Sequence, residues 1–352
     1  MIRAITGWGE SGTGETRVLP GIALIGLPIL LVMLVLSGCS DDQKGGKMVY
    51  TSQGGGVQNI YLVEPGNSPF RLTDSPSKDS SPRISPDGKM VAFVSERNGK
   101  RDVFVVDIKG QGLVQISDGT GNVSSPRWSP DGEMIAYLST SEEGGVHIYL
   151  TDVEDPSPHR LTVGSKDEGP PAWSPDGRWI AFSLTDEEGE GLGIFLRNPG
   201  GVNQIPLTEG PDLLPSWAPD SKAIVFQSTR SGNEDIYVVD VIDENIALEP
   251  RRLTNNPEAD LTPTWSPDGK WIAFISERDG NPEIYLVSLD GTLLKRLTIN
   301  EASEEDVTWS EDGRLAFVSH LHGNADIFIM DSDGGNQSQI TLDPGPDTQP
   351  HW

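Results

Sequence analysis

The sequence predicts an all-β fold, a seven-bladed β-propeller with four strands in each blade. Three observations support this prediction: a motif that recurs at a nearly constant period, four short strands within one period, and two chain ends that each hold part of a seventh copy. Repeats of about 40 to 45 residues with four strands each are typical of propeller blades. Because each blade packs only on its neighbours, the 352 residues need not be divided into several domains.

The repeat is centred on an anchor residue that precedes a tight turn and an apolar run, as in "TWSPDGKWIAF". Successive anchors are 43 to 48 residues apart, and they are Ile84, Trp128, Trp173, Trp217, Trp265, Trp309 and Trp352. In "SPDG" the proline fixes φ at the second turn position, the aspartate can bond its own backbone, and the glycine tolerates a positive φ. The turn aspartates, such as Asp87 and Asp268, are therefore expected to be structural.

One period contains four short strands in a fixed order. In residues 262–298 the runs "TPTW", "KWIAFIS", "EIYLVSL" and "RLT" are separated by "SPDG", "ERDGNP" and "DGTLLK". Runs rich in β-branched and aromatic residues, bounded by clusters of Gly, Pro, Asp and Asn, indicate strands joined by hairpins. We expect six whole blades, beginning near Ser81, Ser125, Pro170, Leu214, Thr262 and Asp306.

The two ends of the chain predict how the ring closes. Residues 48–73 match the second, third and fourth strands of a blade, and the final residues "TQPHW" match the first strand that is missing there. We expect the C-terminal strand to pair with the N-terminal strands and complete the seventh blade. Such a seam has no free sheet edge, which removes a site of edge-to-edge aggregation. The propeller is therefore assigned to residues 48–352.

Residues 1–47 differ in kind from the repeats. An uncharged apolar segment, residues 18–36, is followed by "LSGC" and the polar stretch "SDDQKGGK". This order resembles the lipobox of bacterial lipoprotein signal peptides. The resemblance implies a signal peptide over residues 1–38, lipidation of Cys39 and a tether over residues 39–47. The alternative is an uncleaved transmembrane helix, because 19 apolar residues can just span a bilayer.

Either arrangement exports the propeller. We therefore expect a monomer that is anchored as a lipoprotein to the bacterial cell membrane, on its periplasmic or cell-surface side. Cys39 is the only cysteine of the chain, so no internal disulfide can form.

The formal net charge is −27, from 26 basic and 53 acidic residues. Such a polyanion is repelled by phosphate backbones, which argues against nucleic acid as a partner. Basic protein surfaces, cationic ligands and divalent metals are compatible with this charge, and the alternative is that acidic turns only keep the protein soluble. The more acidic loops, after the fourth strand and between the second and third, share one face of the predicted ring. That face is the candidate binding surface.

A carboxylate lies five residues before the anchor in six of the seven copies: Asp79, Glu168, Asp212, Asp260, Glu304 and Asp347. This register places each one where the first strand begins, near the mouth of the ring. One hypothesis is that these carboxylates converge on the channel and bind calcium, another divalent cation, or a lysine or arginine tail of a partner. The alternative is that each caps backbone N–H groups where the chain enters its blade.

Three arginines occupy one site of the repeat, in the loop after the second strand. Each precedes an acidic residue by five positions, so we expect ion pairs within the hairpin: Arg97 with Asp102, Arg230 with Asp235 and Arg278 with Glu283.

The chain contains no GxSxG, HExxH, P-loop or CxxC motif. We therefore expect neither an enzyme nor a cofactor. His320 and His322 share one loop, and two histidines beside carboxylates suit a transition metal. A metal-dependent, lyase-like enzyme acting on carbohydrate is therefore an alternative.

The motifs "TWSPDGKWIAFIS", "SERDGNPEIYLV" and "STRSGNEDIYVVD" resemble the repeats of the TolB-type β-propellers, and the resemblance covers residues 48–352. Three positions depart from the pattern, with Ile84 in place of Trp, Ser221 in place of Gly and Glu311 in place of Pro. The resemblance implies a propeller that binds a protein or an envelope polymer as a scaffold. It does not imply a particular partner, because a fold does not fix a function.

Overall fold

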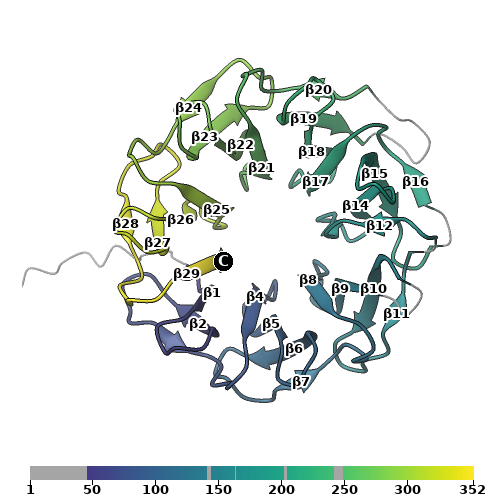
Figure 1. The fold of residues 1–352 in the computed structure, drawn as a ribbon, viewed down its shortest axis with the longest axis vertical. Helices are drawn as coiled ribbons and strands as arrows, with labels where there is room; N and C mark the ends of the chain where they lie inside the picture. The colour runs from purple at the N-terminus through teal and green to yellow at the C-terminus, as the bar shows by residue number, and fades with distance from the viewer. Residues whose placement is uncertain (1–45, 141–143, 163, 202–203, 242–248) are drawn as a thin grey trace, which may run out of the picture. The chain divides into compact units, whose positions relative to one another are not determined.

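The computed structural model describes residues 46–140, 144–162, 164–201, 204–241 and 249–352, all within one compact unit, Gln43–Trp352. Seven small antiparallel sheets of this unit stand around a central opening (Figure 1). The prediction of an all-β, seven-bladed propeller is confirmed. The expected signal peptide, Cys39 and most of the tether lie outside the described residues. Within the described residues, no helix is long and apolar enough to cross a membrane.

Six blades follow one another along the chain. Blade 1 consists of β4 (Asp79–Ile84), β5 (Met90–Ser95), β6 (Asp102–Asp107) and β7 (Val114–Gln115). Blade 2 consists of β8 (Val123–Trp128), β9 (Met134–Thr140), β10 (Val146–Asp152) and β11 (His159–Arg160). Blade 3 consists of β12 (Asp167–Glu168), β13 (Ala172–Trp173), β14 (Ile180–Thr185), β15 (Gly191–Arg197) and β16 (Gln204–Pro206).

The second half of the ring repeats this arrangement. Blade 4 consists of β17 (Asp212–Trp217), β18 (Ala223–Ser228), β19 (Asp235–Asp240) and β20 (Arg251–Arg252). Blade 5 consists of β21 (Asp260–Trp265), β22 (Trp271–Ser276), β23 (Glu283–Ser288) and β24 (Leu294–Arg296). Blade 6 consists of β25 (Glu304–Trp309), β26 (Leu315–Ser319), β27 (Asp326–Met330) and β28 (Ser338–Gln339).

Blade 7 joins the two ends of the described chain. Its strands, in spatial order, are β29 (Asp347–His351), β1 (Met48–Ser52), β2 (Asn59–Val63) and β3 (Phe70–Arg71). His351 lies opposite Val49 in this sheet, and the Thr51 and Thr348 hydroxyls are 2.8 Å apart. The predicted closure by pairing of the C-terminal and N-terminal strands is confirmed.

The antiparallel order gives the ring two distinct faces. We call the turn face the one that carries the turns between the first and second strands of the blades, such as "SPDG" at residues 85–88. We call the loop face the opposite one, which carries the connections between blades and the loops between second and third strands. The turn aspartates have the expected role: Asp87 accepts hydrogen bonds from the Ser85 hydroxyl at 2.7 Å and from the Lys89 amide at 3.1 Å.

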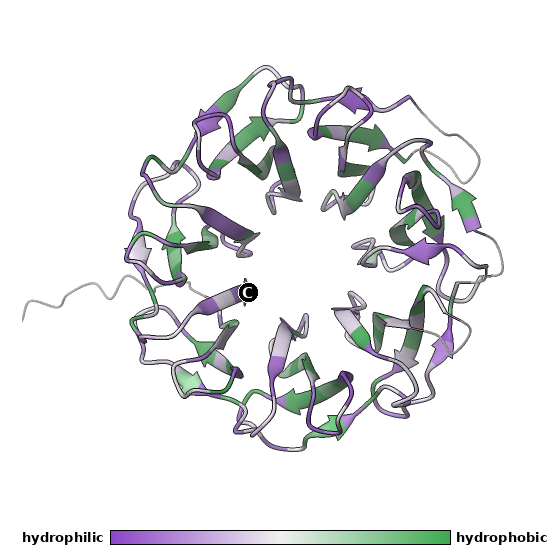
Figure 2. Ribbon diagram, viewed as in Figure 1, coloured by the Kyte–Doolittle hydropathy of each residue, from purple (hydrophilic) through white to green (hydrophobic). Residues whose placement is uncertain are grey.

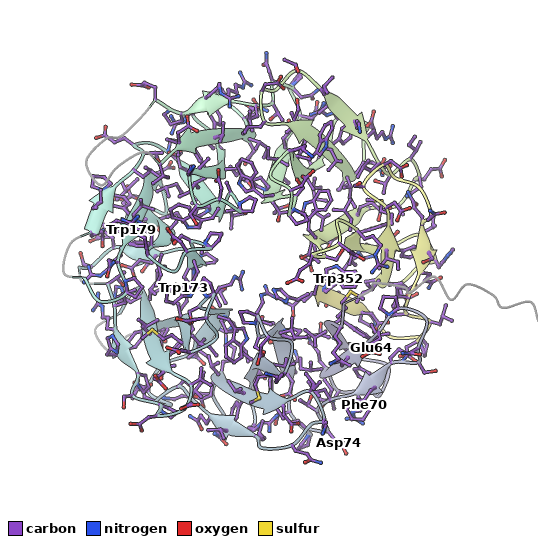
Figure 3. The ribbon with its side chains drawn as sticks, turned by 180° about the vertical axis from the view of Figure 1, so that it is seen from behind. Glu64, Phe70, Asp74, Trp173, Trp179 and Trp352 are labelled. Atoms are coloured by element: carbon purple, nitrogen blue, oxygen red, sulfur yellow. The ribbon has the colours of Figure 1, made fainter. Side chains whose placement is uncertain are left out.

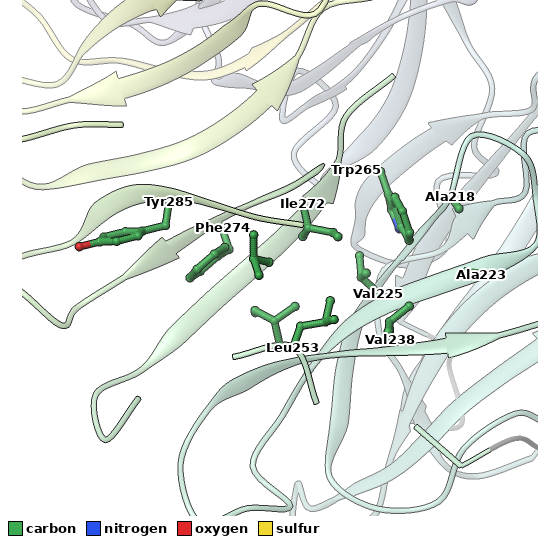
Figure 4. Close-up of a cluster of buried hydrophobic side chains, with 11 residues drawn as sticks. Ala218, Ala223, Val225, Val238, Leu253, Trp265, Ile272, Phe274 and Tyr285 are labelled. Carbon is green, nitrogen blue, oxygen red and sulfur yellow. The ribbon is translucent and has the colours of Figure 1, made fainter. Parts of the chain in front are cut away.

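The hydrophobic core lies between neighbouring blades. The middle strands of the blades are mostly hydrophobic, whereas the inner strands β25 and β29 are mostly hydrophilic (Figure 2). Figure 4 shows one such cluster, in which Trp265 of blade 5 packs with Val225 and Val238 of blade 4. Inside every blade two aromatic rings from the second and third strands face each other with centroids 5.7 to 6.3 Å apart, as in the pair Phe274 and Tyr285.

One hydroxyl per blade ties the outer strand to the sheet. The Thr that follows the fourth strand, or Ser117 in blade 1, accepts a hydrogen bond from a backbone N–H of the third strand at 2.8 to 3.2 Å. In blade 7 the third strand is β2, and Thr73 accepts the hydrogen bond from its Ile60 amide. The bond satisfies a buried N–H that the two- or three-residue outer strand leaves without a ladder partner. This contact explains the recurrence of threonine after the fourth strand.

The inner strands share a backbone irregularity at the channel. Six residues, each three positions before an anchor, have φ between 49° and 58°: Ser81, Ser125, Leu214, Thr262, Asp306 and Gln349. The strand register shifts at this point, so each inner strand contains a β-bulge. Blade 3 has Pro170 there, and proline cannot adopt a positive φ. Its inner strand is accordingly split into β12 and β13.

Candidate functional site

The structure places the six register carboxylates inside the blades and not at an open mouth. All are between 0 and 5% exposed: Asp79, Glu168, Asp212, Asp260, Glu304 and Asp347. Their side chains turn away from the channel because the inner strand alternates its side chains between channel and sheet interior. The geometry therefore supports an interior anchoring role, and the carboxylates are not presented to a partner on the loop face.

Arginines from the same blades neutralise three of these carboxylates. Arg97 lies 3.1 Å from Asp79, and Arg278 lies 2.9 Å from Asp260. Arg230 pairs with Asp212 in the same way. Each guanidinium also lies over the aromatic pair of its blade, at 4.5 to 5.8 Å from the ring centroids. Each such unit joins a fully buried carboxylate to a half-buried guanidinium, which also forms a cation–π contact.

The expected hairpin ion pairs are therefore wrong. The loop folds each guanidinium back over the aromatic rings towards the inner strand, so it cannot also reach the acid on the third strand. Those acids have other partners: Asp102 accepts from the Ser117 hydroxyl at 2.8 Å, and Asp235 pairs with Arg252 at 2.6 Å. Glu283 pairs with Arg296 at 3.0 Å.

Blade 3 lacks this arginine, and a histidine from blade 2 replaces it. His147 Nδ1 lies 2.9 Å from Glu168, and the Thr162 hydroxyl donates to the same carboxylate oxygen at 2.9 Å. Burial raises the pKa of Glu168, although Thr162 and His147 partly oppose this effect. The pair links two blades beneath the loop face.

Asp347, at the seam, has no cation at all among the described residues. Gly54 occupies the site of the missing arginine, and neither carboxylate oxygen of Asp347 has a well-formed hydrogen bond within the described part of the chain. Burial raises the pKa of Asp347 to about 6, although the Ser52 and Thr341 hydroxyls partly oppose this. The seam blade therefore contains an acid that titrates near neutral pH.

We expect Asp347→Asn to raise the melting temperature at pH 8 and to have no such effect at pH 4. The folded pKa exceeds the unfolded value of about 3.9, so the carboxyl is protonated in the fold below pH 4, and its buried charge costs stability above pH 6. The cost at pH 8 corresponds to about 3 kcal/mol. Asp79→Asn is the matched control, since it removes a paired carboxylate and should lower the melting temperature at pH 8. Equal effects of the two variants would contradict this account.

The channel itself is lined by the residues that immediately precede the anchors. These are Arg83, Arg127, Ala172, Ser216, Thr264, Thr308 and His351. They enclose a cavity of about 580 Å³ together with the prolines and bulge residues of the inner strands. Trp173 and Trp352 lie on the inner side of the ring, whereas Phe70 and Asp74 lie towards its outer rim (Figure 3).

Three basic side chains stand next to one another in this channel layer. We call His351 of blade 7, Arg83 of blade 1 and Arg127 of blade 2 the basic arc. The other four blades have only small or hydroxyl side chains at the same site. Within the described residues, neither guanidinium forms an ion pair with a carboxylate: Arg83 donates to the Pro82 carbonyl at 2.7 Å and Arg127 to the Pro126 carbonyl at 2.9 Å.

The basic arc opens onto the turn face. A second cavity of about 1000 Å³ shares Arg83, Arg127, Trp128 and His351 with the channel. It also includes the "SPDG" residues of blade 1, the corresponding turn of blade 6, and the start of the described chain at Gly46. The candidate site is therefore the channel with its turn-face mouth, and binding at the acidic loop face stays a prediction from the sequence.

A sequence profile of the family PD40, described as the TolB beta propeller domain, matches residues 41–192, 100–249 and 204–318. These matches together span well over half of the chain. The chain belongs to the TolB β-propeller family.

Individual members of this TolB family match short parts of the chain. The protein TolB homolog of Chlorobium luteolum is 37% identical over 101 residues, which are 27% of this chain and 23% of that protein. The Tol-Pal system protein TolB of Syntrophus aciditrophicus is 51% identical over 51 residues, 14% of this chain and 11% of that protein. The chain thus aligns with less than a quarter of the length of either relative.

Solved structures share the TolB-type ring. The putative TolB of Agrobacterium tumefaciens matches with a TM-score of 0.54 and 27% identity, over 68% of this chain and 88% of that one. TolB of Acinetobacter baumannii matches with a TM-score of 0.58 and 22% identity, over 87% and 66%. An oligogalacturonate lyase in complex with manganese matches with a TM-score of 0.69 and 17% identity, over 81% and 85%. The last two likenesses show the fold alone.

The histidines considered for a metal do not converge in this TolB-type propeller. His320 and His322 are both exposed; His320 Nε2 lies 3.4 Å from Glu305, and His322 packs on Phe328 with ring centroids 6.0 Å apart. His351 lies in the channel. Among the residues that the structure describes, no group of three or more His, Cys, Asp or Glu side chains is arranged to hold a metal ion.

The basic arc is the feature that the sequence analysis missed. A signal was present, because the residue before the anchor is Arg, Arg or His in three copies and small or hydroxyl-bearing in the others. The three copies are the first, the second and the last in the chain, so they become neighbours only when the ring closes.

Proposed function

We propose that this chain is an exported, lipid-anchored TolB-type scaffold that binds a partner protein at the turn-face mouth of its channel. One observation carries the proposal: the basic arc lies in an open cavity, and neither of its guanidinium groups pairs with a carboxylate among the described residues. Charged groups that the fold does not need are the usual mark of a binding site. Membership of the TolB family supports a protein as the partner, because one relative is named as part of the Tol-Pal system.

The length of the tether limits how far such a scaffold can lie from a membrane. Gly46 lines the turn-face cavity, and six residues lie between it and Cys39. The seven Cα-to-Cα steps of this segment span at most about 25 Å when it is fully extended. If Cys39 carries the lipid, the mouth of the channel stays within this distance of the bilayer surface. A membrane-attached or envelope-associated protein is then the partner that could reach it.

The anchor is tested with Cys39→Ser in the organism that encodes the chain. The parent should sediment with membranes, and the variant should be found in the soluble exported fraction or retain its leader. Ser and Cys are nearly isosteric, so the propeller is unaffected and its melting temperature serves as the control. Membrane association that persists in the variant, with the leader removed, would refute lipidation at this residue.

The binding site is tested by placing a photo-crosslinking residue at Glu311, which is exposed at the turn-face mouth. We expect crosslinking in intact cells to capture one partner protein from this position. The same residue at Leu294, on the outer rim and 48% exposed, is the matched control and should not capture that partner. Capture of the same protein from both positions, or none from Glu311, would refute the site.

A further inference from the structure

The basic arc contrasts with the charge of the rest of the molecule. The chain carries a net charge of −27, and the half-buried arginines beneath the loop face, Arg97, Arg230 and Arg278, are each paired with a carboxylate. Arg83 and Arg127 instead stand side by side in neighbouring blades without a carboxylate at ion-pair distance among the described residues. Two adjacent like charges in a partly buried site are unfavourable until an anion joins them. The two arginines of the arc therefore lack the anion that would stabilise their charges.

Burial and mutual repulsion both act on this pair. Burial lowers the pKa of Arg83 to about 10, and Asp306 partly opposes the effect. Burial and the charge of Arg83 together hold the pKa of Arg127 well below its usual value. Both side chains still carry their charge at neutral pH, because a guanidinium is very rarely deprotonated in proteins. A bound anion would relieve the repulsion.

The hydrogen-bond donors of the arc are largely free for such an anion. A guanidinium has five N–H donors, and each arginine uses one on the carbonyl of the proline before it. Burial and the two arginines keep the pKa of His351 well below its usual range, so its ring is neutral at pH 7. Its Nδ1 lies 3.4 Å from the Ile84 amide as an acceptor, which leaves the hydrogen on Nε2.

The remaining lining decides which anion fits. Asp306 is the one carboxylate among the channel-lining residues, and it accepts a hydrogen bond from the Gln349 amide at 3.2 Å. The other lining groups are proline and tryptophan rings, aliphatic side chains, serine and threonine hydroxyls and the Gln349 side chain. The turn-face mouth also carries four carboxylates, two of which are paired with a cation, Asp87 with Lys89 and Asp312 with Arg314; the other two are Glu64 and Glu311. A bare phosphate would leave this apolar surface unused, whereas a peptide can cover it and still present a carboxylate to the planar forks of two arginines.

We propose that the basic arc of His351, Arg83 and Arg127 binds an aspartate, glutamate or C-terminal carboxylate of an acidic peptide segment that enters the channel from the turn face. This inference rests on the proposed function and names the chemistry of the partner. The carboxylate accepts N–H donors from both guanidiniums, and the flanking peptide packs on Trp128 and the channel prolines.

The first test uses the full exported chain and a labelled peptide of about twelve residues that contains four aspartates and one tryptophan. We expect it to bind at low salt, and we expect Arg83→Gln with Arg127→Gln to weaken binding by at least about tenfold. Lys100→Gln with Arg101→Gln changes the net charge equally on the loop face and should leave the affinity unchanged. The double arc variant should melt no lower than the parent, which shows that it is folded.

Three competing outcomes would overturn the inference: equal binding by the parent and the double arc variant, no binding of the peptide at all, or tighter binding of inorganic phosphate or oligogalacturonate than of the peptide. Crosslinking from Glu311 separates this inference from the proposed function. Partner capture that survives the double arc variant would keep the scaffold function and remove the acidic peptide. A parent without partner capture would remove the scaffold function itself.

Discussion

Removal of the last six residues, 347–352, should lower the melting temperature of the whole propeller by well over 10 °C and promote its aggregation. These residues form β29, the inner strand of blade 7, which pairs with β1 along Val49, Thr51 and Ser52. Their loss removes the Trp352 packing against the cluster of Met48 and Tyr50. It also exposes β1 as a free sheet edge, and such edges template pairing with other chains.

A rescue experiment tests whether the loss of β29 accounts for the effect of the truncation. A synthetic peptide of residues 343–352 should restore the melting temperature of the truncated chain when it is added in excess, because it can supply β29 in trans. A scrambled peptide of the same composition is the control and should have no effect. Calorimetry is the measurement, and a truncated chain that melted within about 2 °C of the parent would show that the seam does not hold the ring together.

Arg278→Met should destabilise the protein by about 3 to 5 kcal/mol at pH 7, because it leaves the fully buried Asp260 without its cation. The methionine keeps most of the apolar contact with Phe274 and Tyr285, so the loss reports mainly the orphaned carboxylate. Denaturant unfolding at pH 7 measures the loss.

Two further variants isolate the buried ion pair. Lys270→Met breaks the ion pair with Asp268, whose side chains are 74% and 49% exposed, and should change stability by less than about 1 kcal/mol. Asp260→Asn combined with Arg278→Met leaves no charge in the blade and should recover most of the stability lost by Arg278→Met alone. A double variant no more stable than the single one would mean that the stacked guanidinium, and not the unpaired acid, accounts for the loss.

Much of the fold follows from the sequence, because every blade repeats the same local signals. The "SPDG" turns, the anchors and the alternating strands each need only nearby residues, and the seam follows from counting strands at the two ends. Ion-pair partners could not be read in this way. Arg278 lies five residues from Glu283 but pairs with Asp260, 18 residues away, because the hairpin brings it back to the inner strand. A short separation along the chain therefore does not identify the ion-pair partner.

The candidate site was harder to predict for a related reason. Its three basic residues are separated by up to 268 positions, so no local motif contains them. Acidic residues outnumber basic residues by 53 to 26 and favoured the loop face as the binding surface, although many carboxylates stabilise turns or lie inside blades. Only in the closed ring do the three basic side chains of the arc lie next to one another.

The residues that stabilise the ring occupy different positions in the repeat from the residues whose side chains line the channel. Threonines, anchors and aromatic pairs hold each blade, whereas the side chain of the residue before each anchor lines the channel. Four of these residues also accept a hydrogen bond from the anchor indole of the next blade, but through the backbone carbonyl, which a substitution retains. The seven side chains around one axis could therefore be exchanged together with little change to the packing between blades. A library randomised at these seven sites would make the propeller a general receptor, with its recognition chosen independently of its stability.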